Sequence, residues 1–277
     1  MISNLTETEV NSRTNKKTEA KEPYPTSKYS TVDSHTDSLT IEELAGSIDH
    51  AILAPTITDQ VFQETVNLAA ELELFSVCVP SSRVKSAVTQ IQMTSSSLKV
   101  GTVVAFPHGN ASLSSIRAEI TAAADSGAVE VDAVIDISLV LSNRIPKAVS
   151  LIANLAELAK TEGVEKFKVI FENAYLTPEQ IIELSQAFSQ VEAVDFIKTS
   201  TGYAPSGATL EDVKLMVKHG GSKEVKASGG IRTLDQYLDF RQAGATRFGT
   251  SNSAVLLRDL ASRLETGTAT NEQGGAY

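Results

Sequence analysis

The stretch around which the chain is organised reads Val194-Asp195-Phe196-Ile197-Lys198-Thr199-Ser200-Thr201-Gly202. It begins as a short apolar strand and ends in small polar residues and a glycine, and Lys198 stands where the apolar run stops. Because desolvating an ammonium group costs free energy, a lysine at the end of a buried strand is a candidate for chemistry. The alternative is a lysine whose stem is buried while its ammonium group reaches solvent.

Short β-branched stretches of this kind recur along the chain after residue 41 and alternate with helical patterns. The expected strands are Ser47–Asp49, Phe75–Val79, Val100–Ala105, Glu130–Ile135, Lys166–Phe171, Val194–Lys198, Glu224–Ala227 and Arg247–Gly249. The expected helices include Thr58–Leu72, Leu113–Ser126, Lys147–Glu162, Thr177–Phe188, Thr209–Lys218 and Thr233–Gln242. Thr177, Thr209 and Thr233 are expected to cap their helices, since threonine accepts hydrogen bonds from the free N–H groups of a first turn.

Eight strands that alternate with helices predict an α/β protein with a closed (β/α)8 TIM barrel. An open, doubly wound sheet is the alternative, but it usually has fewer strands and a glycine-rich loop after the first one. Here the first strand continues into His50-Ala51-Ile52-Leu53, which contains no glycine. The pattern therefore favours one barrel domain that covers residues 41–264.

The two ends of the chain have a different composition from the barrel. Residues 1–40 are rich in Ser, Thr, Asn, Lys and Glu, with few apolar side chains, and we expect a disordered tail. A transit peptide is disfavoured because the segment is acidic at Glu7, Glu9, Glu19 and Glu22. Residues 265–277 are expected to form a flexible C-terminal tail.

Composition limits the classes of partner. The 277 residues are 42% apolar, and 24 basic against 34 acidic side chains give a net charge of −10. No basic patch with interleaved aromatic residues indicates nucleic-acid binding, and no apolar run approaches the ~20 residues of a membrane span. Cys78 is the one cysteine, so no internal disulfide can form. We expect a soluble protein of the reducing cytoplasm.

Candidate catalytic residues come from the carboxyl ends of the strands, where TIM barrels place their active sites. Lys198 ends the sixth expected strand and Lys226 the seventh, so the two lysines should be neighbours. Two ammonium groups in a partly desolvated site disfavour each other's charge, and a nucleophilic lysine must be neutral. Asp132, on the fourth strand, is placed to take and return protons. A plain ion pair between Asp132 and Lys226 is the alternative.

Two small-residue loops indicate a phosphate site. Ala227-Ser228-Gly229-Gly230 follows the seventh strand, and Gly249-Thr250-Ser251-Asn252-Ser253 follows the eighth and opens a helix. Barrels often bind phosphate at these two loops, through backbone N–H groups and a helix N-terminus. Gly202, after Lys198, adds a further candidate N–H group.

The sequence contains little that indicates a metal, a cofactor or a catalytic thiol. Cys78 is expected as a small buried residue near the end of the second strand. The chain's four histidines form no triad pattern with it and show no metal-ligand spacing; they are His35, His50, His108 and His219. We therefore expect neither a metal nor another cofactor.

Seven of these segments together resemble deoxyribose-phosphate aldolases, class I aldolases that split 2-deoxy-D-ribose 5-phosphate. The segments are Ile48-Asp49-His50, Ser76-Val77-Cys78-Val79-Pro80, Thr102-Val103-Val104-Ala105-Phe106-Pro107-His108-Gly109, Gly127-Ala128-Val129-Glu130-Val131-Asp132, Phe196-Ile197-Lys198-Thr199-Ser200-Thr201-Gly202, Val225-Lys226-Ala227-Ser228-Gly229-Gly230-Ile231-Arg232 and Gly244-Ala245-Thr246-Arg247-Phe248-Gly249-Thr250-Ser251. They run from about residue 41 to residue 260.

The resemblance implies a role for each matched residue. Lys198 matches the lysine that forms the Schiff base, Lys226 the second lysine that perturbs its pKa, and Asp132 the aspartate of the proton relay. The matched phosphate-contacting positions are Gly202, Gly229, Gly230, Gly249 and Ser251. Further candidates around the site are Asp49, Cys78, Thr201, Asn252 and Tyr277, the last as the family's C-terminal tyrosine.

The chain departs from the family pattern at Ala51, Ala133 and Asn252, where the family usually has Thr, a larger apolar residue and a small residue. These departures leave the substrate preference and the rate open. The resemblance implies reversible cleavage to D-glyceraldehyde 3-phosphate and acetaldehyde without a cofactor. The oligomeric state stays open, with a homodimer as one candidate. The alternatives are a Schiff-base aldolase for another sugar phosphate and a catalytically silent sugar-phosphate-binding barrel.

Overall fold

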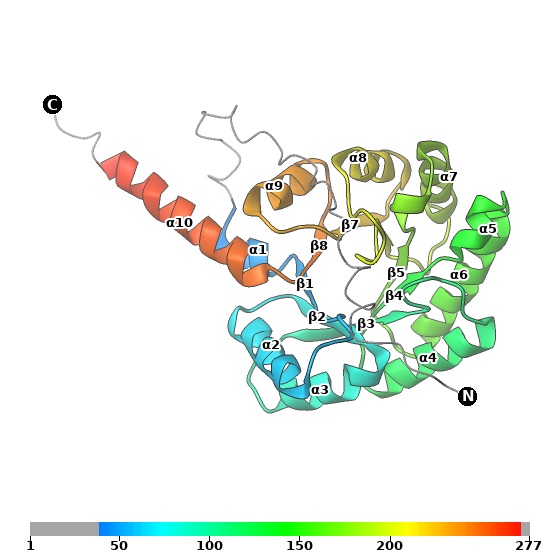
Figure 1. The fold of residues 1–277 in the computed structure, drawn as a ribbon, viewed down its shortest axis with the longest axis horizontal. Coiled ribbons are helices and arrows are strands. Elements are labelled where there is room, and N and C mark those ends of the chain that lie inside the picture. The colour runs from blue at the N-terminus through cyan, green and yellow to red at the C-terminus, as the bar shows by residue number, and fades with distance from the viewer. Residues whose placement is uncertain (1–38, 273–277) are drawn as a thin grey trace, which may run out of the picture. The chain divides into compact units, whose positions relative to one another are not determined.

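The computed structural model describes residues 39–272, and in them eight parallel strands close into a barrel (Figure 1). Each strand pairs with the next in sequence, and β8 pairs with β1 to close the sheet. The strands are β1 Ile48–Ala51, β2 Ser76–Pro80, β3 Lys99–Val104, β4 Glu130–Val134, β5 Lys166–Ile170, β6 Phe196–Lys198, β7 Glu224–Ser228 and β8 Arg247–Thr250. The predicted (β/α)8 barrel is confirmed.

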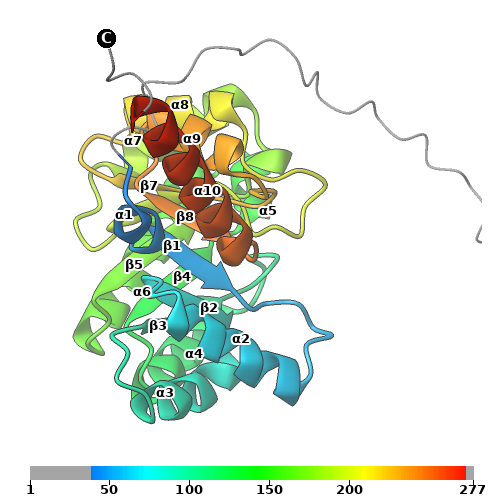
Figure 2. The same ribbon diagram turned by 90° about the vertical axis from the view of Figure 1, so that its left-hand side faces the viewer.

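Helices follow the strands and surround the barrel, as Figures 1 and 2 show. They are α1 Ile41–Ala45, α2 Asp59–Glu71, α3 Val84–Gln92, α4 Leu113–Asp125, α5 Ile137–Leu141, α6 Ile145–Thr161, α7 Pro178–Phe188, α8 Leu210–His219, α9 Leu234–Gln242 and α10 Ser253–Glu272, with short 3-10 turns η1 Ser81–Arg83 and η2 Asn173–Tyr175. Among these described elements, no helix is both long and apolar enough to cross a membrane.

Side-chain caps explain where several helices begin. The hydroxyl groups of Thr177, Thr209 and Thr233 each accept a hydrogen bond from the N–H group three residues further on, as the sequence predicts. At Thr177 and Thr233 a glutamine at that position bonds back to the cap, which completes a capping box. In contrast, α3 has no side-chain cap at Arg83, and this helix is absent from the sequence-based expectation.

The boundaries of the expected strands and helices differ from the observed ones by at most two residues. Three differences bear on the limits of the domain or on the site. The first is Leu39, which is buried in the core, and Thr40, which caps α1, so both belong to the barrel domain rather than to the tail. The second is α10, which continues past residue 264 to Glu272 and includes Gly267. The third is β7, which ends at Ser228, one residue beyond the expected Ala227, so Lys226 lies inside the strand. Residues 1–38 and 273–277, including Tyr277, lie outside the described residues.

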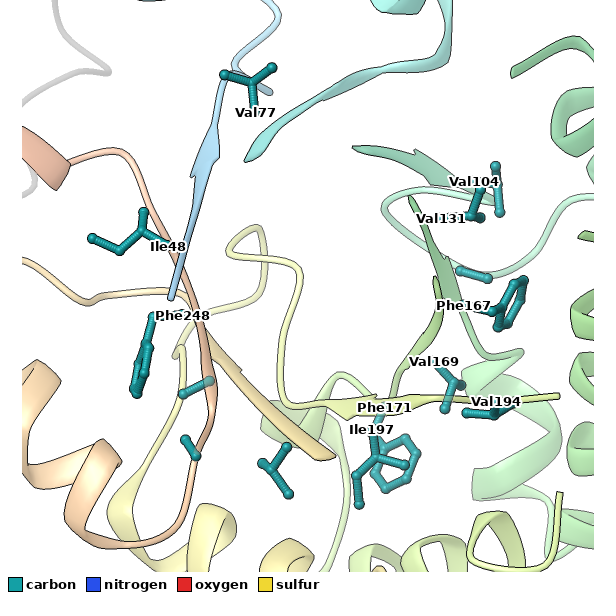
Figure 3. Packing of buried hydrophobic residues seen from close by; sticks show 14 of the residues in the cluster. Ile48, Val77, Val104, Val131, Phe167, Val169, Phe171, Val194, Ile197 and Phe248 are labelled. Atoms are coloured by element: carbon teal, nitrogen blue, oxygen red, sulfur yellow. The ribbon is translucent and has the colours of Figure 1, made fainter. Parts of the chain in front are cut away.

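The apolar core lies between the strands and the surrounding helices (Figure 3). Side chains alternate between the two faces of a strand, so every second residue points to this layer. In β5, Phe167 and Val169 are fully buried in it, as are Val131 of β4 and Ile197 of β6. The residues between them, such as Lys168, point to the barrel interior, and this alternation places the charged side chains there.

Candidate active site

Lys198 and Lys226 are direct neighbours inside the barrel, as the sequence predicts. The register of β6 and β7 pairs the two residues, and both side chains are at most 4% exposed. Their ammonium groups donate to the same carboxylate oxygen, Oδ2 of Asp132, at 2.7 Å from Lys198 and 2.8 Å from Lys226. Asp132 thus contacts the candidate nucleophile directly, and Lys226 is linked to it through the same carboxylate oxygen.

Asp49 takes part in the same arrangement from β1. Its Oδ2 accepts a hydrogen bond from Lys226, and its Oδ1 accepts one from the Ser76 hydroxyl at 2.8 Å. Lys226 therefore has carboxylate contacts from two strands, to Asp49 of β1 and to Asp132 of β4. Ser76 itself was not singled out from the sequence, because a serine in a strand has no distinctive pattern.

Three further charged residues of this interior are not predicted from the sequence: Glu130, Lys168 and Arg247. Lys168 donates to Oδ1 of Asp132 at 2.8 Å and to Oε2 of Glu130 at 2.5 Å. Arg247 donates to Oδ1 of Asp49 at 2.8 Å and lies 3.3 Å from Oε2 of Glu130. A usable signal exists in the sequence, since Lys168 stands between the apolar residues Phe167 and Val169 in a strand.

The environment separates the two lysines electrostatically. Burial lowers the pKa of Lys198, and the charge of Lys226 lowers it further against the opposing effect of Asp132. Burial also acts against the charge of Lys226, but Asp132 and Asp49 outweigh it and raise its pKa. Despite its burial, Asp132 has a pKa well below its usual range because Lys168, Lys198 and Lys226 surround it. Lys198 is thus the lysine whose environment favours the neutral amine.

A cavity of about 470 Å³ opens above these residues at the carboxyl end of the strands. Lys198, Lys226 and Asp49 lie in its wall, whereas Asp132 lies behind the lysines. The predicted phosphate-contacting residues and three of the further candidates also line it: Gly202, Gly229, Gly230, Gly249, Ser251, Thr201, Asn252 and Cys78. Of the sequence-predicted candidates within the described residues, only Asp132 is not in the wall.

Gly229, in the loop after β7, and Gly249, within β8, each allow a close approach to a neighbouring segment. Gly229 has a φ of +84°, and a Cβ atom there would lie 3.0 Å from the Cα of Gly207 and 3.4 Å from that of Gly202. A Cβ atom on Gly249 would lie 2.3 Å from Oγ of Ser228. That Ser228 hydroxyl is buried, lines the cavity and has no hydrogen-bond partner among the described residues. The cavity therefore offers backbone N–H groups and an unused hydroxyl on its β7–β8 side.

The loop after β6 is held in place by side chains from neighbouring segments. Glu172, in a left-handed backbone conformation with φ +59°, accepts hydrogen bonds from the Thr201 hydroxyl and from its N–H group at 3.1 Å. Tyr203 donates its hydroxyl to the carbonyl oxygen of Leu53 at 2.8 Å and packs edge-on against Phe106. The loop thus spans the cavity mouth from β6 to the segment after β1.

Cys78 and His50 lie near the cluster without the properties of a catalytic base or nucleophile. Burial raises the pKa of the Cys78 thiol to about 11, so it stays protonated at neutral pH. Burial lowers the pKa of His50 to about 4, and its Nδ1 lies 2.7 Å from the Ser253 hydroxyl. In the described part of the chain, no group of three His, Cys, Asp or Glu side chains has the geometry of a metal site. The interior carboxylates contact ammonium and guanidinium groups instead.

Comparison with known families settles the membership of the chain. The DeoC/LacD family aldolase profile matches residues 44–261. The chain belongs to the DeoC/LacD aldolase family. The matched region begins just before β1 and ends within α10, so it contains the whole barrel and every interior charged residue described above.

Individual members of this aldolase family are similar over most of the barrel. The chain is 37% identical over 223 residues to the deoxyribose-phosphate aldolase of Rhodopirellula baltica, covering 80% of this chain and 91% of the relative. It is 38% identical over 222 residues to that of Carboxydothermus hydrogenoformans, covering 79% and 96%.

Solved structures of the aldolase family share the fold. The aldolase QR15 superimposes with a TM-score of 0.74 at 33% identity, covering 80% of this chain and 98% of that one. The tetrameric deoxyribose phosphate aldolase from Aeropyrum pernix gives a TM-score of 0.75 at 26% identity, covering 82% and 95%.

Proposed function

We propose that this member of the DeoC/LacD family is a class I deoxyribose-phosphate aldolase in which Lys198 forms the Schiff base. The observation that carries the proposal is the shared oxygen of Asp132, which contacts Lys198 at 2.7 Å and Lys226 at 2.8 Å next to a cavity. A lysine with a lowered pKa beside a carboxylate and a second cation meets the requirements of an amine nucleophile.

The reaction begins at the open-chain form of 2-deoxy-D-ribose 5-phosphate. The neutral amine of Lys198 adds to the C1 carbonyl, and the carbinolamine loses water to give an iminium. The C3 hydroxyl then loses its proton while the bond between C2 and C3 breaks, and the electron pair moves into the iminium. Glyceraldehyde 3-phosphate leaves, and an enamine of acetaldehyde stays on Lys198.

The second half of the reaction returns the enzyme to its starting state. The enamine takes a proton at C2 and becomes an iminium again, and water hydrolyses it to acetaldehyde and free Lys198. Asp132 and Lys226 are the groups we assign to these proton transfers, directly or through a water, because Asp132 contacts the amine and Lys226 contacts the same carboxylate oxygen. Every step is reversible, so the same site catalyses the aldol addition.

Substrate orientation is assigned to the loops on the β7–β8 side. Gly202, Gly229, Gly230, Gly249 and Ser251 line the cavity there, and α10 begins at Ser253 behind them. Backbone N–H groups and a helix N-terminus favour an anion, which suits the 5-phosphate of the sugar. This placement sets the phosphate away from Lys198 and brings C1 of the same molecule toward it.

The experiment combines turnover with chemical trapping. The enzyme should release acetaldehyde from 2-deoxy-D-ribose 5-phosphate, and borohydride with substrate should add mass irreversibly at Lys198. Trapping without cleavage would indicate a Schiff-base enzyme for another sugar phosphate. Neither cleavage nor trapping would indicate a silent sugar-phosphate-binding barrel, and mass on Lys226 would exchange the roles of the two lysines.

A further inference from the structure

The barrel interior holds a closed cluster of charged side chains from six of the eight strands. Its seven members are Asp49, Glu130, Asp132, Lys168, Lys198, Lys226 and Arg247. All of them are 9% exposed or less, so water screens their charges poorly. We call this set the interior cluster.

The contacts inside the interior cluster are unequal. Lys168 contacts Glu130 and Asp132 at 2.5 and 2.8 Å, Lys226 contacts Asp49 and Asp132, and Arg247 lies 2.8 and 3.3 Å from Asp49 and Glu130. Lys168 also lies 3.7 Å from Oδ2 of Asp49. Each of these three cations therefore has at least two carboxylate partners.

Lys198 differs from the other three cations. Its ammonium group has one carboxylate contact, to Oδ2 of Asp132, and that oxygen also accepts from Lys226. Lys198 also lines the cavity, where an uncharged amine can be reached by a substrate. Its positive charge is therefore the one that the carboxylates of the cluster stabilise least.

The cluster contains more cationic than anionic side chains, which gives the weaker pairing of Lys198 a consequence. With every side chain ionised, four cations face three carboxylates, and the buried cluster carries one excess positive charge. An uncompensated charge in a poorly screened interior is costly, and a titratable group responds by becoming neutral. Arginine does not lose its proton in proteins, so the neutral member is a lysine.

We propose that Glu130, Lys168 and Arg247 are positioning residues that fix the charge balance of the interior cluster. This balance makes Lys198 the cation that loses its proton and becomes a neutral amine. This inference deepens the proposed function and rests on it, because it concerns the reactivity of the proposed nucleophile. It assigns the neutrality of Lys198 to the whole cluster, and not to Lys226 alone.

The electrostatics of the individual groups agree with this assignment. The pKa values of Lys168, Lys226 and Arg247 are raised by their carboxylate partners, whereas that of Lys198 is lowered. The two remaining strands, β2 and β3, add no charged side chain to the interior cluster, since Lys99 of β3 pairs with Glu165 outside it. The Cys78 thiol of β2 is protonated, Ser76 of β2 donates to Asp49, and Thr102 of β3 donates to a carbonyl oxygen.

The same balance acts on the intermediates. The iminium on Lys198 returns one excess positive charge to the cluster, whereas the enamine is neutral. The cluster therefore favours the step in which the iminium accepts the electron pair of the breaking C2–C3 bond. The same arrangement of charges thus favours the neutral amine of Lys198 before the reaction and the conversion of the iminium into the neutral enamine during it.

The test removes one charge of each sign, singly and together. Glu130→Gln makes the cluster more positive, so the pKa of Lys198 falls and the acid limb of the kcat/KM profile moves to lower pH. Lys168→Met makes it less positive, so the limb moves to higher pH. We expect each limb to move by about one pH unit, typical of a nearby charge. The double variant restores the charge balance, and its limb should return close to that of the unaltered enzyme.

A merely structural role would not produce opposite displacements that cancel. The proposal is overturned if the two single variants move the limb in the same direction, if neither moves it, or if the double variant keeps a single variant's displacement. If Lys168→Met does not fold, Glu130→Gln and the double variant still decide. Arg247 is less suited to the test, because its guanidinium also packs on the Phe75 ring at 3.5 Å.

Borohydride trapping separates this inference from the proposed function. Acetaldehyde and borohydride are applied to each folded variant over a range of pH, and the rate of mass addition at Lys198 is measured. The pH at which trapping becomes half-maximal should move with the kcat/KM limb. Absence of trapping in the unaltered enzyme would refute the proposed function. Trapping whose pH dependence is the same in all variants would refute the charge balance alone.

Discussion

Phe167 and Lys168 are consecutive residues of β5, yet they lie in opposite environments. Phe167 packs among apolar side chains between the sheet and the helices, whereas Lys168 contacts two carboxylates inside the barrel. Both are almost completely buried. The comparison shows that burial alone does not define the role of a residue here. The outer face of the barrel sheet is packed by the volume of apolar side chains, whereas the inner face is held by pairs of opposite charges.

The two faces should respond differently to mutation. A smaller side chain on the outer face leaves a cavity and lowers the free energy of unfolding. A change of charge on the inner face alters the protonation of the other charged groups, so it appears in the dependence of the rate on pH. Substitutions on each face test this separation.

The largest effect is expected at the inner face for Lys198→Leu. Without an amine no Schiff base forms, and we expect cleavage to fall by at least about four orders of magnitude, since enzymes exceed uncatalysed rates by more than that. Raising the pH should restore nothing, because the variant has no amine to deprotonate. A pH–rate profile of cleavage measures this, and recovery at high pH would contradict the role of Lys198.

A smaller loss is expected for Lys226→Leu, also on the inner face. Removing this cation should raise the pKa of Lys198, and a pKa higher by about one leaves about tenfold less neutral amine at pH 7. Since the missing activity depends on deprotonation, part of the rate should return as the pH rises. The same profile measures it. An equal loss at every pH would mean that Lys226 transfers a proton itself or holds Asp132.

The outer face should show the opposite behaviour. Phe167→Ala should lower the free energy of unfolding by about 3–5 kcal/mol, the usual cost of removing a buried aromatic side chain. The folded variant should keep the acid limb of its pH–rate profile. Chemical denaturation measures the free energy of unfolding, and the pH–rate profile of cleavage measures the acid limb. Phe167→Leu is a control that should have intermediate stability. A displaced limb would show that the two faces are not independent.

The smallest effect is expected from chelation. The interior carboxylates are occupied by cationic side chains, and the iminium supplies the electron sink, so exhaustive EDTA treatment should leave the cleavage rate unchanged. Activity before and after treatment, with divalent metal added back, tests this. A strict requirement for metal would contradict the Schiff-base mechanism.

The sequence predicts the barrel because its strands and helices have distinct periods and several helices have side-chain caps. It predicts Lys198 because this lysine ends an apolar strand pattern, whereas the choice of Lys226 and Asp132 is supported by the family resemblance. Lys168 has the same place in its strand as Asp132, with which it pairs in register, and it was missed because the resemblance assigns it no role. Arg247 was missed because it begins its strand, where a charged residue is read as an exposed position. Their partners come from other strands, and only barrel closure brings them together.

The groups assigned to the chemistry are carried by strands, and most of the expected anion contacts are carried by the loops that follow; Gly249, within β8, is the exception. Lys198, Lys226 and Asp132 sit in the hydrogen-bonded wall, whereas Gly202, Gly230 and Ser251 stand outside it. The two functions are therefore modular. Redesigning the loops can retarget the enzyme to aldehydes of another length or head group, while the reactivity of the amine is inherited unchanged from the barrel.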